Sequence, residues 1–568
     1  MGFKMKKQWW HEKVAYQIYP KSFCDANGDG VGDIQGIISK LDYLKELGID
    51  IIWISPMYQS PFIDQGYDIS DYYAIDPVFG SMEDMEQLLS ETKKRNMYLL
   101  MDLVVNHCSS QHEWFQKALQ DPEGEYGDYF YIREGKDGGV PCNCNWRSYF
   151  GGSVWEKIPG TNKYYLHMFA KEQPDLNWEN PVVRHKIYDM INWWLDKGLA
   201  GFRIDAIVNI KKDLSFSSMP PDREDGLCAC SKMLKKVRGV EEFLQEMNQE
   251  TFQKNGAFSI AELFDYDENE LEKYIGDGGC FSSIFDFSTE GLGRDDRGWT
   301  AFQSIAPNEY RDTIYASQLR TGNRGFMANI FENHDEPRGV SHYIPEGECC
   351  EESKKLLALL LFMIKGLPFL YQGQEIGMEN NQFTCIEELN DIHTIESYRI
   401  ALEEGYTRQE AMELVNKYSR DNARTPMQWN DSENAGFTTG KPWLCVNQNY
   451  EKINVEEQSK DADSVLNFYK RLINLRKNDR YKEAIVYGDL ELTDKQEDQQ
   501  EDQVFSFYRR GEENTLLVLG NFQNKSVKIR VSDTIKEVIL NTHPTYQLEK
   551  NEITLLPYQG LAACLELC

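Results

Sequence analysis

The strongest constraint on the fold is a repeated alternation of short apolar runs and amphipathic segments over roughly the first four hundred residues. Eight apolar runs have the length and composition of β-strands, at 14–18, 50–54, 98–105, 199–204, 257–261, 282–286, 325–331 and 367–371. Segments 34–47, 82–95 and 182–197 carry apolar residues at helical spacing. Strands separated by helices predict a parallel sheet, and eight of them favour a closed (β/α)₈ TIM barrel of class α/β.

The alternation is interrupted once and stops before the C-terminus. Residues 106–176 are rich in Gly, Trp, Tyr and Asn, so we predict a small domain inserted after the third strand of a barrel at 1–105 and 177–480. Short alternating strands at 504–508, 514–519, 527–531 and 553–556 predict a C-terminal antiparallel β-sandwich domain at 481–568. The hydrophilic stretch 496–503 is expected at a hairpin tip.

The charge balance excludes two classes of partner. The 568 residues include 92 acidic and 61 basic side chains, a formal charge of −31, which should repel nucleic acid and anionic membrane surfaces. The longest apolar run, 356–364, is far shorter than the roughly 20 residues of a membrane span. The first ten residues lack the apolar core of a signal peptide. The expected partners are therefore small molecules, with the chain a monomer or a weak homodimer.

Thirteen cysteines are spread along the chain without the spacing of a structural zinc site. With no export signal visible, reduced thiols in the cytoplasm are the expected state. No organic cofactor is expected.

Polar side chains follow several predicted strands at their carboxyl ends, where the active site of such a barrel lies. Residues 102–107 (DLVVNH) end the third strand, 201–205 (GFRID) the fourth, Glu262 the fifth and 332–335 (ENHD) the seventh. A single acid after a strand is usually a helix cap. Because clustered acids repel one another, several acids with an arginine and histidines on one rim indicate a functional site.

Two carboxyl groups on adjacent strands suit cleavage of a glycosidic bond. One attacks the anomeric carbon, and the other protonates the leaving oxygen and then deprotonates water. Strands about 4.8 Å apart can bring Asp205 and Glu262 to the roughly 5–5.5 Å separation of a retaining enzyme. Arg203, on the same strand face as Asp205, is expected to keep Asp205 ionised, and the charge of Asp205 to raise the pKa of Glu262.

A loop at residues 25–33 (DANGDGVGD) predicts a cation site. It places oxygen donors at alternate positions, Asp25, Asn27, Asp29 and Asp33, and its glycines permit sharp turns. Hard oxygen donors at this density suit Ca²⁺ and, less well, Mg²⁺. Position 12 of the loop is Gly36 rather than Glu, so an EF-hand switch is not indicated. A hydrophilic turn without metal is the alternative.

These segments resemble, in order, the signature regions of the α-amylase family of glycoside hydrolases (family 13). Residues 102–107, 201–205, 262 and 333–335 resemble regions I to IV, and 173–178 (QPDLNW) resembles the extra region of oligo-1,6-glucosidases and neopullulanases. Further similar segments are 65–72 (QGYDISDY), 366–375 (GLPFLYQGQE) and 419–429 (SRDNARTPMQW), the last typical of bacterial α-glucosidases and oligo-1,6-glucosidases. The resemblance extends over nearly the whole chain.

The resemblance implies a role for each matching residue. Asp205 would be the nucleophile, Glu262 the acid/base, and Asp335 a third acid that binds hydroxyls of the distorted sugar ring. Arg203 would orient the nucleophile, and Tyr67 would stack beneath the sugar. Four further residues would contact the same ring, Asp68, His107, His334 and Arg424.

The resemblance has weaker implications for two further parts of the chain. Phe150 and Phe169, in the inserted domain, are candidates for an aromatic wall on the leaving-group side, and a place in the ordinary core is as good a reading. In related glucosidases the 25–33 loop holds a structural cation through its four polar side chains and the carbonyl of Val31. Such a cation would stabilise the loop and take no part in catalysis.

The residue after the nucleophile bears on which bond is cleaved. In the family, Val at this position accompanies α-1,6 cleavage and Thr strict α-1,4 cleavage, whereas this chain has Ala206. A smaller side chain should loosen the leaving-group side and permit both linkages. The next residues, 207–210 (IVNI), look more like the 1,6-active group. Ala261 stands where Gly is common and Glu336 where Gln is common, which leaves the fine specificity open.

The resemblance implies a retaining, exo-acting α-glucosidase acting on short α-glucosides: isomaltose, isomalto-oligosaccharides and maltose. Two alternatives stay open. Lys211 and Lys212 could belong to the basic pocket of a trehalose-6-phosphate hydrolase, and a sucrose-isomerising transglucosylase would use the same acids. The non-enzymatic heavy chain of amino-acid transporters shares the fold but would need a membrane span and usually loses the acids.

Overall fold

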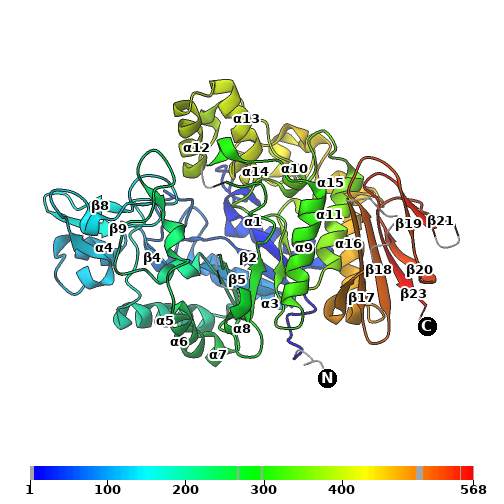
Figure 1. Cartoon of the computed structure of the whole chain (residues 1–568), viewed down its shortest axis with the longest axis horizontal. Coiled ribbons are helices and arrows are strands. Elements are labelled where there is room, and N and C mark those ends of the chain that lie inside the picture. Colours follow the sequence, from blue (N-terminus) through cyan, green and yellow to red (C-terminus); the bar gives the residue numbers. More distant parts are fainter. Residues whose placement is uncertain are drawn as a thin grey trace.

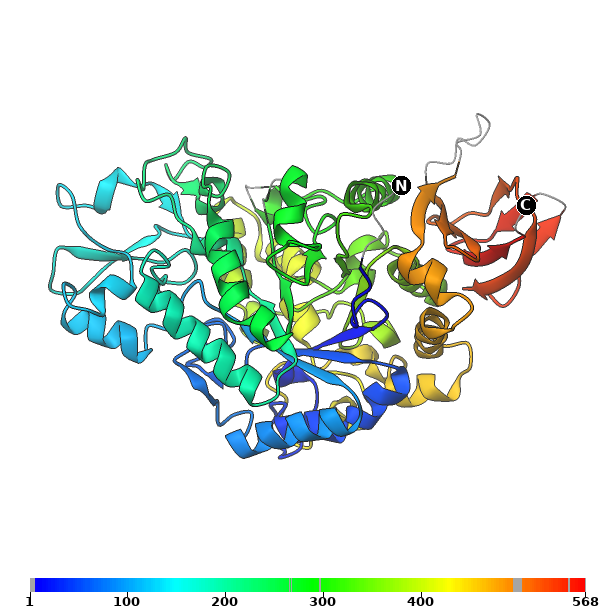
Figure 2. The same ribbon diagram turned by 90° about the horizontal axis from the view of Figure 1, so that it is seen from below.

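The computed structural model describes residues 6–264, 266, 268–295, 298–493, 503–549 and 552–566. Three regions lie in a row (Figure 1): strands of an inserted segment at one end, a barrel in the middle and C-terminal sheets at the other end. The view from below shows the same order (Figure 2). The barrel thus lies between the inserted segment and the C-terminal sheets.

Eight parallel strands close into the barrel, as predicted. Their order around it is the order along the chain, and β15 pairs with β1, Phe369 opposite Ala15, to complete the ring. The strands are β1 (Ala15–Ile18), β2 (Ile51–Ile54), β5 (Tyr98–Leu103), β10 (Gly201–Ile204), β12 (Phe258–Ala261), β13 (Ser283–Asp286), β14 (Ala328–Asn329) and β15 (Leu367–Tyr371).

Alternate residues of these strands pack inside the barrel. The interior cluster contains Leu100 of β5, Ile260 of β12 and Phe285 of β13, all buried. Because successive side chains of a strand face opposite sides, the next inward position after Leu100 is Asp102, and after Ile260 it is Glu262. Apolar side chains therefore fill the lower part of the barrel, and the acids lie in the layer above them.

Helices cover the outside of the barrel. They are α1 (Ile34–Ser39), α2 (Leu41–Leu47), α3 (Met82–Lys94), α5 (Pro181–Asp196), α6 (Val240–Glu250), α7 (Phe252–Asn255), α8 (Leu271–Tyr274), α9 (Pro307–Thr321), α10 (Gly339–Tyr343), α11 (Glu351–Met363) and α16 (Val465–Lys477). The single helix predicted at 34–47 is wrong in one respect. Lys40 leaves the helical conformation (φ −106°, ψ 3°), so α1 ends and α2 begins there.

The inserted segment forms its own small layer. Strands β6 (Ile132–Glu134), β9 (Lys163–Leu166) and β8 (Trp155–Lys157) make an antiparallel sheet beside α4 (Glu113–Gln120). Strand β7 (Trp146–Arg147) instead pairs with β11 (Cys228–Ala229), which follows β10 in the chain. Phe216 and Met233 from this later segment share a buried cluster with Trp146 and Trp155. Two distant segments therefore build one wall beside the barrel rim.

A helical segment after β15 lies over the barrel. It contains α12 (Ile392–Glu403), α13 (Arg408–Tyr418), α14 (Asp421–Arg424) and α15 (Val455–Lys460), and Figure 1 shows α12 and α13 above the barrel. Asp391 caps α12 by accepting from the backbone N–H groups of His393 and Thr394. This capping places Asp391 next to the residues described below.

The C-terminal region consists of two antiparallel sheets. One contains β16 (Asp489–Leu492), β17 (Val504–Arg510), β18 (Thr515–Asn521), β23 (Gly560–Leu565) and β20 (Ile535–Asn541), and the other β19 (Val527–Arg530), β22 (Glu552–Leu555) and β21 (Gln547–Glu549). A Cβ at Gly560 would lie 2.6 Å from Leu359 Cδ2 of α11, so the sheet packs closely on this helix. The predicted hairpin tip at 496–503 falls outside the described residues except for Gln503.

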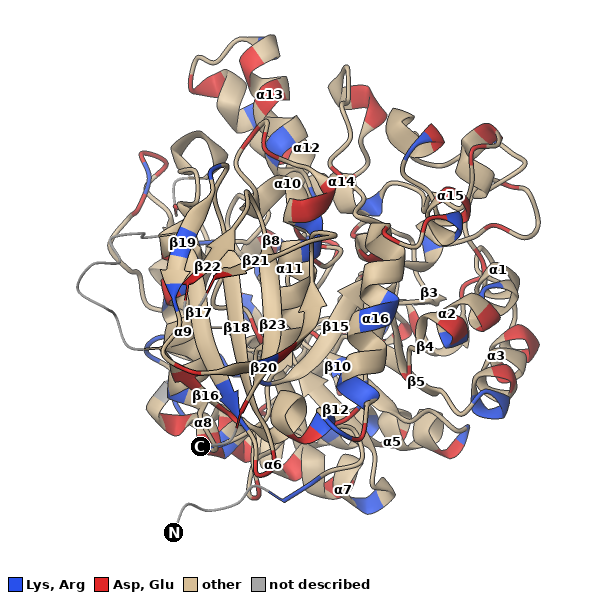
Figure 3. Ribbon diagram, turned by 90° about the vertical axis from the view of Figure 1, so that its right-hand side faces the viewer, with Lys and Arg blue, Asp and Glu red and all other residues tan. Residues whose placement is uncertain are grey.

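Helix α11 contains most of the longest apolar run and is buried from Ser353 to Met363. None of the helices in the described part of the chain is long and apolar enough to cross a membrane. Acidic and basic residues are distributed over the outer helices and strands (Figure 3). The apolar run is thus accounted for by packing between the barrel and the C-terminal sheet.

Candidate active site

Strand register brings the predicted acids together at the barrel rim. In the ladder between β5 and β10, Arg203 lies opposite Asp102, and in the ladder between β10 and β12 it lies opposite Ile260. Asp205 and Glu262 each follow two residues later on the inward face. Neighbouring strands therefore deliver Asp102, Asp205 and Glu262 around a single arginine.

Arg203 is the shared partner of these three carboxylates. Its Nη1 lies 2.8 Å from Asp102 Oδ1 and 2.6 Å from Asp205 Oδ1, and its Nη2 lies 2.9 Å from Glu262 Oε1. The guanidinium is buried, and Trp53 packs against its face at 4.9 Å. One buried cation thus faces three buried acids.

Burial raises the pKa of the Asp205 carboxyl to about 8, with a further rise from the charge of Glu262, although Arg203 opposes both. Burial also raises the pKa of Glu262, and the charge of Asp335 adds to it. The sequence-based expectation named the charge of Asp205 as the cause for Glu262, whereas burial is the main one. Interacting acids of this kind titrate as a pair.

The residue after Asp205 helps to hold Glu262. The N–H of Ala206 donates to Glu262 Oε2 at 2.9 Å. Ala206 has φ 38°, in the left-handed region that costs a non-glycine residue about 1–3 kcal/mol. The turn that aims this N–H is therefore strained, as is common beside reactive groups.

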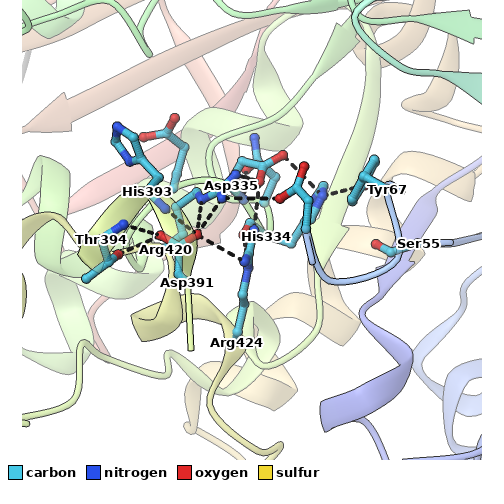
Figure 4. A network of polar contacts seen from close by, with 12 residues as sticks. Ser55, Tyr67, His334, Asp335, Asp391, His393, Thr394, Arg420 and Arg424 are labelled. Atoms are coloured by element: carbon cyan, nitrogen blue, oxygen red, sulfur yellow. Dashed lines mark hydrogen bonds and ion pairs between the residues drawn. The ribbon is translucent and has the colours of Figure 1, made fainter. Parts of the chain in front are cut away.

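Asp335 is held quite differently, by two guanidinium groups and an imidazole. Arg420 Nη1 and Arg424 Nη2 each lie 2.9 Å from Asp335 Oδ1, and His334 Nε2 lies 3.1 Å from Oδ2. These contacts keep the pKa of Asp335 well below its ordinary value. Figure 4 shows Asp335 between His334 and the two arginines, with Asp391 beyond them.

Asp391 and Arg420 are not among the predicted site residues. Arg420 forms an ion pair with Asp391, and Arg424 Nη1 lies 3.6 Å from the same carboxylate oxygen. The pair links the helical segment after β15 to Asp335. Arg420 lies within the 419–429 segment, which is the signal that could have found it. Asp391 carries no local signal beyond its position as a helix cap.

Tyr67 and His334 form a stacked pair beside the acids. Their rings are 5.4 Å apart at 13°, and the Tyr67 hydroxyl lies 2.5 Å from His334 Nε2 and 3.0 Å from Asp102 Oδ2. Burial lowers the pKa of His334 to about 3, so its ring is neutral. The phenol thereby connects Asp102 to the Asp335 side of the site.

A cavity of about 730 Å³ opens above these groups. Eight predicted residues line it: Tyr67, His107, Phe150, Phe169, Asp205, Ala206, Glu262 and Asp335. Four others stand behind the lining: Asp68, Arg203, His334 and Arg424. The predicted residues are thus brought together at one site. Eight of them form the cavity surface, and the other four lie behind it.

The predicted contact of Asp68 with the sugar ring is wrong in this geometry. Asp68 is fully buried, and its carboxylate accepts from Ser60 Oγ at 3.0 Å and from the N–H of Ile63 at 2.9 Å. Asp64, four residues earlier and not predicted, lines the cavity instead. Its Oδ2 accepts from Gln173 Nε2 at 3.0 Å. The tight turn at 64–68 decides which of the two acids faces the cavity.

His107 and the two phenylalanines lie on the wall formed by the inserted segment. His107 Nε2 is 3.0 Å from the carbonyl oxygen of Tyr67, and burial lowers its pKa to about 4. Its ring is 4.9 Å from that of Phe169, which is 5.9 Å from Phe150. Phe150 also packs against the Arg420 guanidinium at 5.7 Å. Both phenylalanines therefore border the cavity, and Phe169 also packs against the buried cluster of the inserted segment.

The loop predicted to bind a cation uses its polar side chains on its own backbone. Gly30 N donates to Asp25 Oδ2 at 2.8 Å, Val31 N to Asp29 Oδ1 at 2.9 Å, and Gly36 N to Asp33 Oδ1 at 2.6 Å. Within the described ranges, no three His, Cys, Asp or Glu side chains are arranged to hold a metal ion. The donor chemistry suits Ca²⁺, and the predicted donors also include the Asn27 side chain and the Val31 carbonyl, so the cation site stays a prediction.

Comparisons with known proteins agree with this geometry. Residues 17–488 match the alpha-amylase catalytic domain model, and residues 504–561 the C-terminal domain of the alpha-amylase SusG. An oligo-1,6-glucosidase of Parageobacillus thermoglucosidasius is 42% identical over 98% of this chain and 99% of its own. A trehalose-6-phosphate hydrolase of Bacillus subtilis is 38% identical over 97% of each chain. The solved isomaltulose synthase of Klebsiella sp. LX3 superposes with a TM-score of 0.91 at 38% identity, covering 99% of this chain and 100% of that one.

Proposed function

The chain belongs to the alpha-amylase family and is a glycoside hydrolase, and on that premise we propose that it is a retaining, exo-acting α-glucosidase. Its proposed substrates are the terminal α-1,6 bonds of isomaltose and short isomalto-oligosaccharides, and also the α-1,4 bond of maltose. The similarity to oligo-1,6-glucosidases supports the α-1,6 preference.

The proposed reaction has two displacements at one carbon. Asp205 attacks the anomeric carbon while Glu262 gives its proton to the glycosidic oxygen, so the bond breaks and a glucosyl ester forms on Asp205. Glu262 then takes a proton from water, whose oxygen displaces Asp205 and releases α-glucose. Arg203, bound to Asp205 Oδ1, stabilises the carboxylate before attack and after release.

The observation that carries this proposal is the single guanidinium shared by Asp205 and Glu262, at 2.6 and 2.9 Å. An inverting enzyme separates its acids by about 6.5–9.5 Å to admit water, and a retaining one by about 5–5.5 Å. Two carboxyls bound to adjacent nitrogens of one guanidinium fit the shorter range better. Two interacting acids that share one proton near neutral pH supply one base and one acid.

The charges around the cavity favour an uncharged substrate over trehalose-6-phosphate. Lys211 Nζ lies 2.7 Å from a Glu179 oxygen and Lys212 Nζ, fully buried, 2.7 Å from an Asp175 oxygen. Neither lysine lines the cavity. Four arginines do. Arg147, Arg294 and Arg420 are each paired with a carboxylate, and Arg223 is the fourth. A phosphate would have to compete with these internal acids.

We further propose a structural Ca²⁺ or Mg²⁺ on the oxygen donors of the 25–33 loop, and a cytoplasmic location for a monomer or weak homodimer. The cation proposal rests on donor chemistry alone. A chelator should lower the melting temperature while the initial rate of glucoside hydrolysis changes less. An unchanged melting temperature would contradict the cation.

A rate panel tests the substrate proposal. The purified chain is offered isomaltose, maltose, sucrose, trehalose and trehalose-6-phosphate, and the products are followed by NMR. Isomaltose should give the largest kcat/KM, with α-glucose appearing before its equilibration with the β form. Initial β-glucose would overturn retention. Faster turnover of trehalose-6-phosphate, or conversion of sucrose into an isomeric disaccharide, would favour one of the alternatives.

A further inference from the structure

One charged cluster on the cavity wall has no part in the reaction described above. It consists of Glu290 and Arg294, from the loop after β13, and Glu336, which directly follows Asp335. All three line the cavity. We refer to them as the Arg294 cluster.

The Arg294 cluster is fixed relative to the catalytic acids. Arg294 Nη2 forms an ion pair with Glu336 Oε2. Glu290 Oε1 accepts from Asn333 Nδ2 at 2.8 Å, and Asn333 Oδ1 accepts from the backbone N–H of Asp335 at 2.7 Å. The residue that positions Asp335 thus also positions Glu290.

The cluster differs from the ion pairs that only support packing. The pair of Arg338 and Glu332 is 0% and 1% exposed, whereas the Arg294 side chain is 41% exposed and Glu336 is 11% exposed. Arg294 also borders the cavity. A guanidinium has five N–H donors, so an ion pair with Glu336 leaves others for a ligand.

The acids of the cluster supply the complementary acceptors. Burial and the charge of Glu336 raise the pKa of Glu290 well above its ordinary value, so Glu290 can donate as well as accept. His342 also lines the cavity, and its buried Nε2 has no hydrogen-bond partner among the residues that the structure describes. Donors and acceptors together suit vicinal hydroxyls of a sugar better than an apolar or anionic group.

We propose that the Arg294 cluster recognises the hydroxyls of the leaving-group sugar and so determines which glucosides this cavity cleaves. The inference rests on the proposed α-glucosidase function. In this proposal Arg294 and Glu336 act as one unit. The positive charge of Arg294 offsets the repulsion between the carboxylates of Glu336 and Asp335, and the Arg294 and Glu336 side chains both bind the leaving-group sugar.

The test compares two substrates with the same glucosyl group. The leaving group of isomaltose is a sugar, whereas that of 4-nitrophenyl α-glucoside is a phenol without sugar hydroxyls. Glu336→Gln, Arg294→Gln and the double variant are assayed on both, with melting temperatures recorded. Arg510→Gln, which removes an exposed ion pair with Glu491 in the C-terminal region, is the matched control.

Each single variant should lower kcat/KM for isomaltose by about 10-fold or more, mostly through KM, and lower that for the aryl glucoside much less. The double variant should lose little more than either single one, because the two residues are coupled. Equal losses on both substrates, or fully additive losses, would overturn the inference and leave a structural ion pair. If the unmodified chain cleaves neither substrate, the proposed function itself fails.

Discussion

Carboxylates are held in opposite ways in two parts of the cavity, which we call its two poles. At the first pole one guanidinium, Arg203, serves three carboxylates, Asp102, Asp205 and Glu262. At the second pole Asp335 contacts two guanidinium groups, which it shares with Asp391, and the imidazole of His334. Burial raises carboxyl pKa values at the first pole, whereas His334, Arg420 and Arg424 lower that of Asp335 at the second despite its burial.

The difference shows that burial alone does not decide protonation. The ratio of cations to acids decides it, because each buried charge needs a partner that offsets its lost hydration. A reaction that transfers one proton benefits from acids that share that proton, here Asp205 and Glu262. It also benefits from a carboxylate that stays ionised, here Asp335. The following experiments test this contrast, from the largest expected effect to the smallest.

Asp205→Asn removes the acid proposed as nucleophile without changing its shape. Turnover of isomaltose should fall by at least about 10⁴-fold, since the amide cannot form the glucosyl ester. The melting temperature should not fall, because the substitution removes a buried acid whose pKa is unfavourably raised. Asp479→Asn, at an exposed site, is the control. Normal turnover by Asp205→Asn would refute the assignment.

Arg203→Gln removes the guanidinium that forms ion pairs with Asp102, Asp205 and Glu262. We expect a loss of about 3–5 kcal/mol in the free energy of unfolding and a fall of about 10³-fold in kcat. Denaturant titration and steady-state kinetics measure the two effects. A variant as stable as the unmodified chain would show that the acids do not depend on this cation.

Arg420→Gln removes one of the partners of Asp335 and leaves Arg424 and His334 in place. Because two partners of Asp335 remain, kcat/KM should fall by about 10- to 100-fold. The free energy of unfolding should also fall, since the buried Asp391 loses its ion pair with Arg420. A loss as severe as that of Arg203→Gln would remove the distinction between the poles.

The pH dependence of kcat/KM tests the shared proton. The acid/base Glu262 must be protonated, and burial raises its pKa, so activity should fall at alkaline pH, up to tenfold per pH unit, as Glu262 loses its proton. Asp335 should stay ionised across this range. A pH profile that is flat to pH 10 would contradict the shared proton.

Stability should depend on pH in opposite ways at the two poles. The pKa of Asp205 is raised above its unfolded value near 3.9, so its contribution is fully present below that pH and is lost as the pH rises toward about 8. The pKa of Asp335 is lowered, so its contribution is present above about pH 3.9 and lost on further acidification. The melting temperature of Asp205→Asn should decrease less between pH 4 and about 8 than that of the unmodified chain.

Much of this site could be predicted because strands impose a period of two on the side chains. Asp102, Arg203, Asp205 and Glu262 follow from that period and from the convergence of parallel strands at one end of a barrel. The strand ends also placed His107 and Asp335 at this rim, and the resemblance of ordered motifs added Tyr67 and the role of each residue. Each of these residues depends on local sequence and on a regular architecture.

The remainder depends on contacts between distant parts of the chain. The choice between Asp64 and Asp68 follows from a turn whose neighbours include Gln173. Asp391 reaches the site through Arg420 of a different helix, and the segment around Cys228 joins the inserted wall by pairing with β7. No short window of sequence contains both partners of such contacts.

The sequence by itself thus determined the barrel, the reaction class and the acids, because local periodicity and motif order encode them. Only the tertiary structure decided which acids face the cavity, how many cations each one has, and therefore which of them keeps a proton. Those properties depend on burial and on through-space charge, which arise when residues hundreds of positions apart are packed together.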